Sequence, residues 1–299
     1  MNKSCTRPSW IIAAGREGLD WSKKDEKRPF MARLKDSKFT SRVLVVAILV
    51  PPVITATYIG GIVFASVVLL AALLACYEFF RLMHKGGFNP SIPLGLLFVV
   101  LFAVAAFQPE WGILAPGLTV LVLSSLIWEL FQAQAPFPTA DWALTVAGGI
   151  YVGWLISHFI SLRSLPDGYI WTMLTFLITW VGDSGAYLVG LKWGKRPLCS
   201  RLSPRKTWEG TVGGWLSGVA AALILGSLAG IPLPHSFAIG AIISTLAPFG
   251  DLAVSMVKRQ VKVKDSGKLF PGHGGMLDRV DSLLFAVVGV YYYVTLVVI

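Results

Sequence analysis

Long apolar runs separated by short polar loops constrain the fold of this chain more than any other feature of its sequence. Of its 299 residues, 55% are hydrophobic and only 14% are charged, whereas soluble domains average about 25% charged residues. A helix of about 20 apolar residues spans a bilayer, and a helix satisfies its own backbone hydrogen bonds where water is absent. The sequence therefore predicts an all-α polytopic membrane protein whose surroundings are the lipid bilayer.

About nine runs approach the length of a transmembrane helix. The predicted helices are residues 43–58, 61–83, 92–107, 113–131, 142–162, 169–191, 207–228, 237–257 and 276–298. Residues 1–42 precede them and lack the continuous apolar core of a secretory signal. We therefore predict a polar, cytoplasmic N-terminal extension of residues 1–42 and a membrane-embedded domain of residues 43–299.

Lys and Arg residues fall almost entirely on one side of these predicted helices. Of the 26 in the chain, many lie in residues 1–42 and others follow the second, sixth and eighth predicted helices, while Arg163 alone lies on the opposite side. Loops rich in Lys and Arg stay in the cytoplasm. We therefore expect a cytoplasmic N-terminus and, after an odd number of crossings, a C-terminus outside.

The net charge of +10 does not indicate a nucleic-acid-binding protein. Such proteins gather their basic residues into one patch or stripe, whereas here predicted membrane helices interrupt the basic clusters, so we expect no nucleic-acid partner. The three cysteines, Cys5, Cys76 and Cys199, are scattered. Their number and spacing predict neither a disulfide framework nor a metal knuckle.

The densest polar segment lies between the last two predicted helices, at residues 255–281: SMVKRQVKVKDSGKLFPGHGGMLDRVD. A cytoplasmic loop needs positive charge, but it does not need the ordered Lys-Asp-x-Gly, Gly-His-Gly-Gly and Asp-Arg-x-Asp found here. A second basic loop, SPRKTWEG at residues 203–210, lies on the same predicted side. Gly lets backbone N–H groups approach a phosphate, and Lys and Arg neutralise it. Both loops are therefore predicted to bind phosphate groups.

Three acidic residues at the rims of the predicted helices have a structural interpretation. Glu78 lies three residues before Arg81, which predicts an interfacial ion pair. Glu129 and Asp141 flank an uncharged loop and are predicted to be solvated helix ends.

Four other aspartates, Asp183, Asp251, Asp278 and Asp281, lie toward the cytoplasmic side. A carboxylate at a helix centre costs about 2.5–3.5 kcal/mol on insertion scales, so it usually faces the bundle interior and has a partner. Hard oxygen ligands suit Mg²⁺, while hydrogen bonds between helices or a proton path are alternatives. The two basic loops at the same face favour a site for a nucleotide with Mg²⁺. In one of them His273 is either a phosphate donor or acid, or a merely polar loop residue.

The segment at residues 255–281 resembles the C-terminal signature of the phosphatidate cytidylyltransferases, or CDP-diacylglycerol synthases. The matching positions are Ser255, Lys258, Arg259, Lys264, Asp265, Gly267, Phe270, His273, Gly274, Gly275, Asp278, Arg279 and Asp281. Residues 203–206, Glu209 and Gly210 resemble a second cytoplasmic motif of that family, and residues 182–184 resemble its acidic motif in the sixth helix. The resemblance covers about residues 40–299. It implies that residues 43–299 form a membrane-embedded cytidylyltransferase domain.

This resemblance implies a helical bundle, commonly homodimeric, with a polar cavity open to the cytosol and to lipid. The implied reaction joins CTP and phosphatidate to give CDP-diacylglycerol and pyrophosphate for phospholipid biosynthesis. The family's cation site corresponds to Asp251 and Asp278, with Mg²⁺ as the expected metal and K⁺ as a candidate second ion. A bacterial plasma (inner) membrane fits the compact chain, with the active site facing the cytoplasm.

The role of each matched residue follows from the resemblance and the charges. The expected catalytic residues are Asp251, Asp278, Lys264, Arg279 and His273. The expected metal ligands are Asp251 and Asp278, supported by Asp183 and Asp281. The expected substrate-binding residues are Ser203, Arg205, Lys206, Glu209, Lys258, Asp265, Lys268, Gly274 and Gly275. The attacking lipid phosphate is already anionic, so catalysis is expected to rest on alignment and charge neutralisation.

Three rival functions make different predictions. Another CTP-dependent membrane enzyme, such as a lipid kinase, would release CDP instead of pyrophosphate. A cation transporter would need polar residues at both membrane faces, whereas the motifs all lie on one predicted face. A purely structural membrane protein leaves the match at residues 255–281 unexplained.

Overall fold

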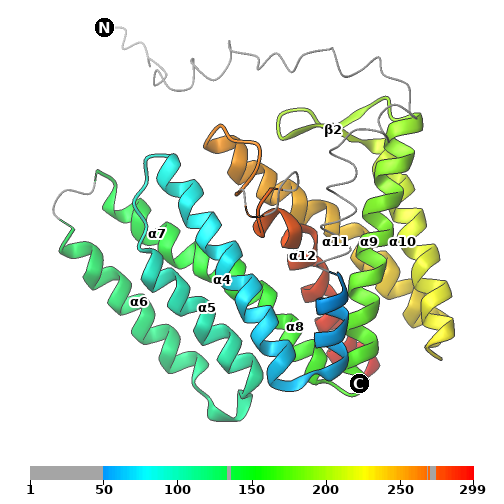
Figure 1. Cartoon of the computed structure of the whole chain (residues 1–299), viewed down its shortest axis with the longest axis horizontal. Coiled ribbons are helices and arrows are strands. Elements are labelled where there is room, and N and C mark those ends of the chain that lie inside the picture. Colours follow the sequence, from blue (N-terminus) through cyan, green and yellow to red (C-terminus); the bar gives the residue numbers. More distant parts are fainter. Residues whose placement is uncertain (1–49, 133–135, 268, 270–273) are drawn as a thin grey trace, which may run out of the picture. The chain divides into compact units, whose positions relative to one another are not determined.

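The structure is a computed structural model that describes residues 50–132, 136–267, 269 and 274–299. The predicted extension of residues 1–42 and the start of the first predicted helix lie outside these residues. The described chain is helical apart from one short hairpin (Figure 1), which confirms the expected all-α membrane architecture.

The helices follow one another with short connections. Helix Val50–Ile59 comes first. The elements after it are α4 (Gly61–Lys85), α5 (Ile92–Phe107), the 3-10 turn η2 (Pro109–Trp111), α6 (Leu114–Leu130), α7 (Pro138–Gly148), the π-helical turn η3 (Gly149–Trp154), α8 (Leu155–Ser164), α9 (Gly168–Trp193), β1 (Pro197–Cys199), β2 (Ser203–Thr207), α10 (Trp208–Leu228), α11 (Leu233–Gln260), α12 (Leu277–Tyr293) and η4 (Val294–Val298).

Each predicted transmembrane run coincides with an apolar helix in the part of the chain that the structure describes. Six helices there are long and apolar enough to cross a membrane, with α7, η3 and α8 counted as one continuous helix. Three apolar helices are shorter: Val50–Ile59, Ile92–Phe107 and Leu114–Leu130. The chain is therefore a polytopic membrane protein, and the full number of crossings remains a prediction.

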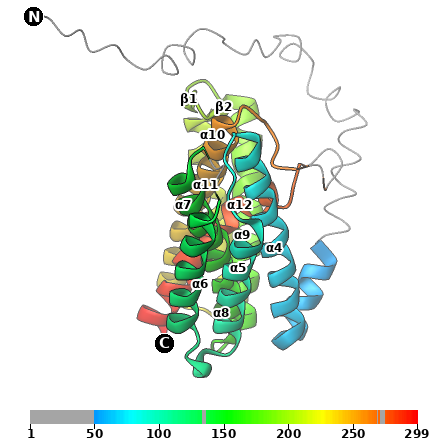
Figure 2. The same cartoon turned by 90° about the vertical axis from the view of Figure 1, so that its left-hand side faces the viewer.

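Helices α9, α10, α11 and α12 are successive neighbours, and α12 also packs against α8 and α4 (Figures 1 and 2). Small residues allow the close approach of α9 and α10, as is usual for helices in lipid. A Cβ atom at Gly214 of α10 would lie 2.8 Å from the Cβ atom of Ala186 on α9. Through these contacts α12 joins the helices before α9 to those after it.

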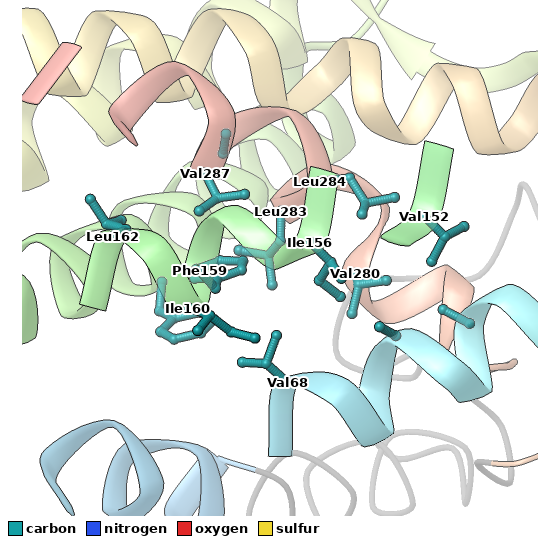
Figure 3. Packing of buried hydrophobic residues seen from close by; sticks show 14 of the residues in the cluster. Val68, Val152, Ile156, Phe159, Ile160, Leu162, Val280, Leu283, Leu284 and Val287 are labelled. Carbon is teal, nitrogen blue, oxygen red and sulfur yellow. The ribbon is translucent and has the colours of Figure 1, made fainter. Parts of the chain in front are cut away.

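Figure 3 shows the apolar packing around α12. Val280, Leu283, Leu284 and Val287 of α12 lie among buried side chains of α4, η3 and α8. Leu284 and Val287 are fully enclosed, with 0% exposure. Because lipid is itself apolar, such contacts stabilise the bundle by close packing more than by removing surface from water. The first turn of α12, with its predicted site residues, is therefore held in a packed frame.

The hairpin was not predicted from sequence. Strands β1 and β2 are antiparallel, with Pro197 opposite Thr207 and Cys199 opposite Ser203. The Thr207 hydroxyl then caps α10 by accepting a hydrogen bond from the Gly210 N–H at 3.1 Å, a common N-cap arrangement. The predicted phosphate-binding loop at residues 203–210 is thus a strand followed by a helix N-terminus. Figure 1 shows it at the opposite end of the helices from the C-terminus.

Candidate functional site

Two ion pairs connect the predicted basic loops with the two aspartates predicted to bind metal. Lys206 on β2 pairs with Asp251 on α11. Lys258, near the end of α11, pairs with Asp278 in the first turn of α12, with Lys258 Nζ 2.7 Å from Asp278 Oδ1. The first pair therefore joins the hairpin to α11, and the second joins the end of α11 to the start of α12.

Asp278 is held on both carboxylate oxygens. Oδ1 faces Lys258, and Oδ2 accepts hydrogen bonds from the Ser266 N–H at 2.8 Å and the Gly275 N–H at 3.0 Å. The Ser266 hydroxyl also lies 2.9 Å from Oδ2. Bonds to backbone donors and to a cation favour the ionised carboxylate. Asp278 is therefore positioned as an anion whose orientation depends on the loop before α12.

Asp251 lies one helical turn before Ser255 on α11. Its Oδ2 pairs with Lys206, and its Oδ1 accepts a hydrogen bond from the Ser255 hydroxyl at 3.3 Å. About a quarter of the Asp251 side chain is exposed (27%). This carboxylate is therefore partly accessible to a ligand.

Asp183 and Asp281 extend the acidic cluster around Asp251. Asp183 on α9 lies within electrostatic range of Asp251 and Lys206, and it accepts a hydrogen bond from the Ser282 side chain. Asp281 on α12 interacts electrostatically with Asp251 and Asp183. The Ser282 N–H donates to Asp281 Oδ1 at 2.8 Å. Carboxylates from three helices are thus gathered in one region.

This donor set has the chemistry that Mg²⁺ prefers, since it consists of carboxylate oxygens. Across the described ranges, no three His, Cys, Asp or Glu side chains converge closely enough to hold one ion. Two ammonium groups instead stand against the two aspartates to which the sequence assigns the metal. The carboxylates therefore suit a divalent cation by their chemistry, while in the structure two lysines neutralise them.

The loop before α12 contains several predicted phosphate ligands. Lys264 and Asp265 in this loop, and Arg279 in the first turn of α12, are exposed and therefore accessible to a ligand. Two further predicted residues, Lys268 and His273, lie outside the described residues.

Gly274 and Gly275 were predicted to let the backbone approach a phosphate, and the structure gives them contacts with carboxylates. Gly274 has φ = +79°, a conformation that favours glycine. A Cβ atom on either glycine would collide with a carboxylate, that of Asp278 at Gly274 and that of Glu78 at Gly275. The need for glycine at both positions therefore has a local cause within the protein.

The hairpin arranges the other predicted phosphate ligands. Ser203 and Lys206 are partly buried and Arg205 is exposed. Glu209, predicted to bind substrate, accepts hydrogen bonds from the Lys195 N–H at 3.0 Å and the Arg196 N–H at 3.2 Å. Glu209, in the first turn of α10, therefore fixes the segment just before β1 to the start of that helix.

Arg259 is a positioning residue to which the sequence analysis assigned no role. Its Nε donates to the Leu202 carbonyl at 3.1 Å, and its Nη1 donates to the Val263 carbonyl at 2.8 Å. One guanidinium thereby links the hairpin to the loop after α11. The sequence signal for Arg259 was the Lys-Arg pair of the signature. Only the fold shows that Lys258 faces Asp278, whereas Arg259 faces the hairpin and the loop after α11.

The predicted ion pair between Glu78 and Arg81 is wrong. Arg81 is exposed and lies over the Tyr77 ring, 5.9 Å from its centre. Glu78 is buried and accepts hydrogen bonds from Ser266 and from the start of α12. Glu78 and Arg81 are near each other in sequence, but Glu78 lies on the packed side of α4, whereas the Arg81 side chain is exposed.

The predicted solvation of Glu129 and Asp141 is also wrong. Glu129 is 7% exposed and Asp141 is 0% exposed. Asp141 Oδ1 accepts a hydrogen bond from the Asn89 N–H at 2.7 Å. Helices α6 and α7 pack against each other, which encloses side chains that a loop-based interpretation left in water.

Comparison with known proteins shows the family of the chain. Residues 40–297 match the model of the cytidylyltransferase family. The chain is 30% identical to a phosphatidate cytidylyltransferase of Bacillus subtilis, over 80% of this chain and 91% of the relative. It is 31% identical to one of Synechocystis, over 86% and 97%, and 30% identical to one of Brucella suis, over 86% and 93%. The resemblance predicted from residues 255–281 is thereby confirmed.

Proposed function

The chain belongs to the cytidylyltransferase family, and from this premise we propose that it transfers the cytidylyl group of CTP to phosphatidate. The products are CDP-diacylglycerol, a precursor of phospholipids, and pyrophosphate. The observation that carries the proposal is the pairing of Lys206 with Asp251 and of Lys258 with Asp278. Each pair sets a lysine beside an aspartate, which supports a site where lysines bind phosphate groups and carboxylates bind a metal ion.

In the proposed reaction, a phosphate oxygen of the lipid attacks the α-phosphorus of CTP. A new P–O bond forms, the bond from the α-phosphorus to the bridging oxygen breaks, and pyrophosphate leaves with that electron pair. The lipid oxygen is already anionic, so the site needs no strong general base. Its task is to align two anions and to neutralise their charge.

The residues divide this task by charge. Asp251 and Asp278, with Asp183 and Asp281 in support, would hold Mg²⁺, with K⁺ as a candidate second ion. When bound, Mg²⁺ neutralises the triphosphate and the charge that develops on pyrophosphate.

Five basic groups on the two loops would bind phosphate oxygens. Lys206 and Lys258 stand against the aspartates and can turn to phosphate oxygens when a cation replaces them. Arg205, Lys264 and Arg279 are exposed on the two loops and would bind the triphosphate or the lipid phosphate.

We further propose about nine membrane crossings with a cytoplasmic N-terminus and an external C-terminus. The distribution of Lys and Arg supports this orientation, and CTP is then available to the site from the cytosol. The proposed location is a bacterial plasma membrane. A homodimer is proposed on the family resemblance.

Pyrophosphate release tests the function. The purified full chain in mixed micelles with phosphatidate, CTP and Mg²⁺ should release pyrophosphate and form CDP-diacylglycerol. Matched reactions without phosphatidate, or with EDTA, should release none. Release of CDP in place of pyrophosphate would indicate a lipid kinase and would contradict the proposal, as would cation flux in liposomes without any CTP turnover.

A further inference from the structure

We propose that Glu78 is a positioning residue for the reaction, whose buried carboxylate sets the place of Asp278 by holding the loop before α12. This inference deepens the proposed function and rests on it for its kinetic part. Glu78 lies on α4, far from the signature in sequence, and the sequence analysis interpreted it as a surface ion pair. The structure places it against the signature loop.

The first argument is the use of both Glu78 oxygens. Oε1 accepts a hydrogen bond from the Met276 N–H at 3.0 Å, and Oε2 accepts one from the Leu277 N–H at 3.0 Å. The Ser266 hydroxyl lies 2.7 Å from Oε2. Glu78 is only 8% exposed. Because an ionised carboxylate is costly to bury without donors, these bonds explain why the charge is tolerated here.

The second argument is the position of these donors at the start of α12. The first N–H groups of a helix have no partner within the helix, and its positive end favours a carboxylate. Met276, the N-cap residue of α12, makes no capping hydrogen bond through its own side chain. Glu78 therefore caps α12 from a different helix, and it ties the first turn that carries Asp278 to the packed frame of α4.

The third argument is that Ser266 connects the two carboxylates. Its hydroxyl oxygen lies 2.7 Å from Glu78 Oε2 and 2.9 Å from Asp278 Oδ2. A hydroxyl has one proton and can donate to one acceptor at a time. The Ser266 N–H already donates to Asp278. The two carboxylates therefore compete for the one hydroxyl proton of Ser266. A change in the charge of Glu78 then changes how strongly the hydroxyl binds Asp278.

The fourth argument is steric. Gly267 and Gly275 both lie against the Glu78 carboxylate, and a Cβ atom at Gly267 would be 2.8 Å from Glu78 Cδ. A Cβ atom at Gly275 would also meet the Glu78 oxygens. Two glycines of the signature therefore make room for this acid.

The test compares Glu78→Gln with Glu110→Gln, an exposed glutamate on η2 that serves as the matched control. Gln keeps the shape of Glu78 but turns an NH₂ group toward one of the donors, which leaves a buried donor unpaired. The kcat for pyrophosphate release should fall about 10- to 100-fold, the usual effect of removing a group that orients a metal ligand. The Mg²⁺ concentration for half-maximal rate should rise, and Glu110→Gln should change neither value.

A second readout does not need turnover. Hydrogen–deuterium exchange should become faster at Met276 and Leu277, which bond to Glu78, and also at Ser266 and Gly275, which bond to Asp278. Kinetics and exchange that both match the native chain would overturn the proposal. So would faster exchange confined to Met276 and Leu277, because Glu78 would then cap the helix without positioning Asp278.

Two outcomes need separate treatment. If Glu78→Gln does not purify as a folded protein, Ser266→Ala decides, because it removes the hydroxyl that connects Glu78 with Asp278 and leaves the Ser266 N–H bond and the cap on α12. It should reproduce the raised Mg²⁺ requirement, and an unchanged requirement would overturn the inference. If the native chain releases no pyrophosphate, the proposed function fails. The exchange experiment then decides by itself whether Glu78 positions Asp278.

Discussion

Lys258 Nζ lies 2.7 Å from Asp278 Oδ1, and the two side chains are only 11% and 8% exposed. This ion pair ties the end of α11 to the start of α12 in a place largely closed to water. An enclosed pair is a weak argument for stability but a strong argument against removing one partner, because the remaining charge stays buried. In the structure the pair therefore connects two site helices and favours the ionised form of Asp278.

Lys258→Met should lower both stability and activity. Breaking an enclosed pair on one side costs about 3–5 kcal/mol of unfolding free energy, which would appear as a lower midpoint of thermal aggregation in detergent. The double variant Lys258→Met with Asp278→Asn removes both charges and should recover much of this midpoint while remaining inactive. A double variant as unstable as Lys258→Met would show that packing of the lysine stem, and not charge pairing, is what matters.

The four aspartates should differ in importance for pyrophosphate release. Asp251→Asn and Asp278→Asn should each lower kcat at least about 100-fold, since each removes a charged metal ligand. Asp183→Asn and Asp281→Asn should lower it about 10-fold, as supporting residues do. Lys262→Met, at an exposed position in the same loop, is the control and should stay within about twofold of the native rate. Equal effects at all four aspartates would contradict the division into ligands and supports.

Glu209→Gln should act through the hairpin. It weakens the hydrogen bonds to the Lys195 and Arg196 N–H groups, so trypsin should cleave after Lys195 faster than in the native chain. The KM for CTP should rise severalfold because the hairpin carries Arg205 and Lys206, while the KM for phosphatidate stays the same. A raised KM for CTP with unchanged cleavage would instead indicate direct contact between Glu209 and the nucleotide.

The orientation in the membrane can be tested by cysteine labelling in intact cells. In a chain with its own cysteines replaced, a membrane-impermeant reagent should label Glu110→Cys from outside. Lys195→Cys should react only after the membrane is permeabilised, because the hairpin faces the cytoplasm in the proposed topology. Both positions are exposed, so access to the side chain does not limit the reaction. Labelling of Lys195→Cys in intact cells would reverse the orientation.

Some features of this chain could be predicted from the sequence because they depend on local composition. The apolar runs predict the helices, since length and hydropathy decide whether a segment enters lipid. The order of Lys, Asp, His and Gly at residues 255–281 predicts the family and the aspartates of the site. These signals need no knowledge of which helices are neighbours.

Other features depend on which helix faces which. Glu78 was assigned to Arg81 because i,i+3 residues can meet on a helix, and only the packing of α4 against the signature loop shows its bonds to Ser266 and α12. Glu129 and Asp141 were placed in water for the same reason, because loop residues alone do not reveal that α6 and α7 enclose them.

The sequence by itself determined that this is a helical membrane protein of the cytidylyltransferase family, and it predicted Asp251 and Asp278 as site residues. Only the tertiary structure decided how that site is held together. Lys206 meets Asp251, Lys258 meets Asp278, and Glu78 caps α12. The physical reason is the distance along the chain over which each effect acts. Insertion into lipid and the chemistry of a motif depend on residues that are close in sequence. The partners of a buried charge come from any segment that the packing of the helices places next to it.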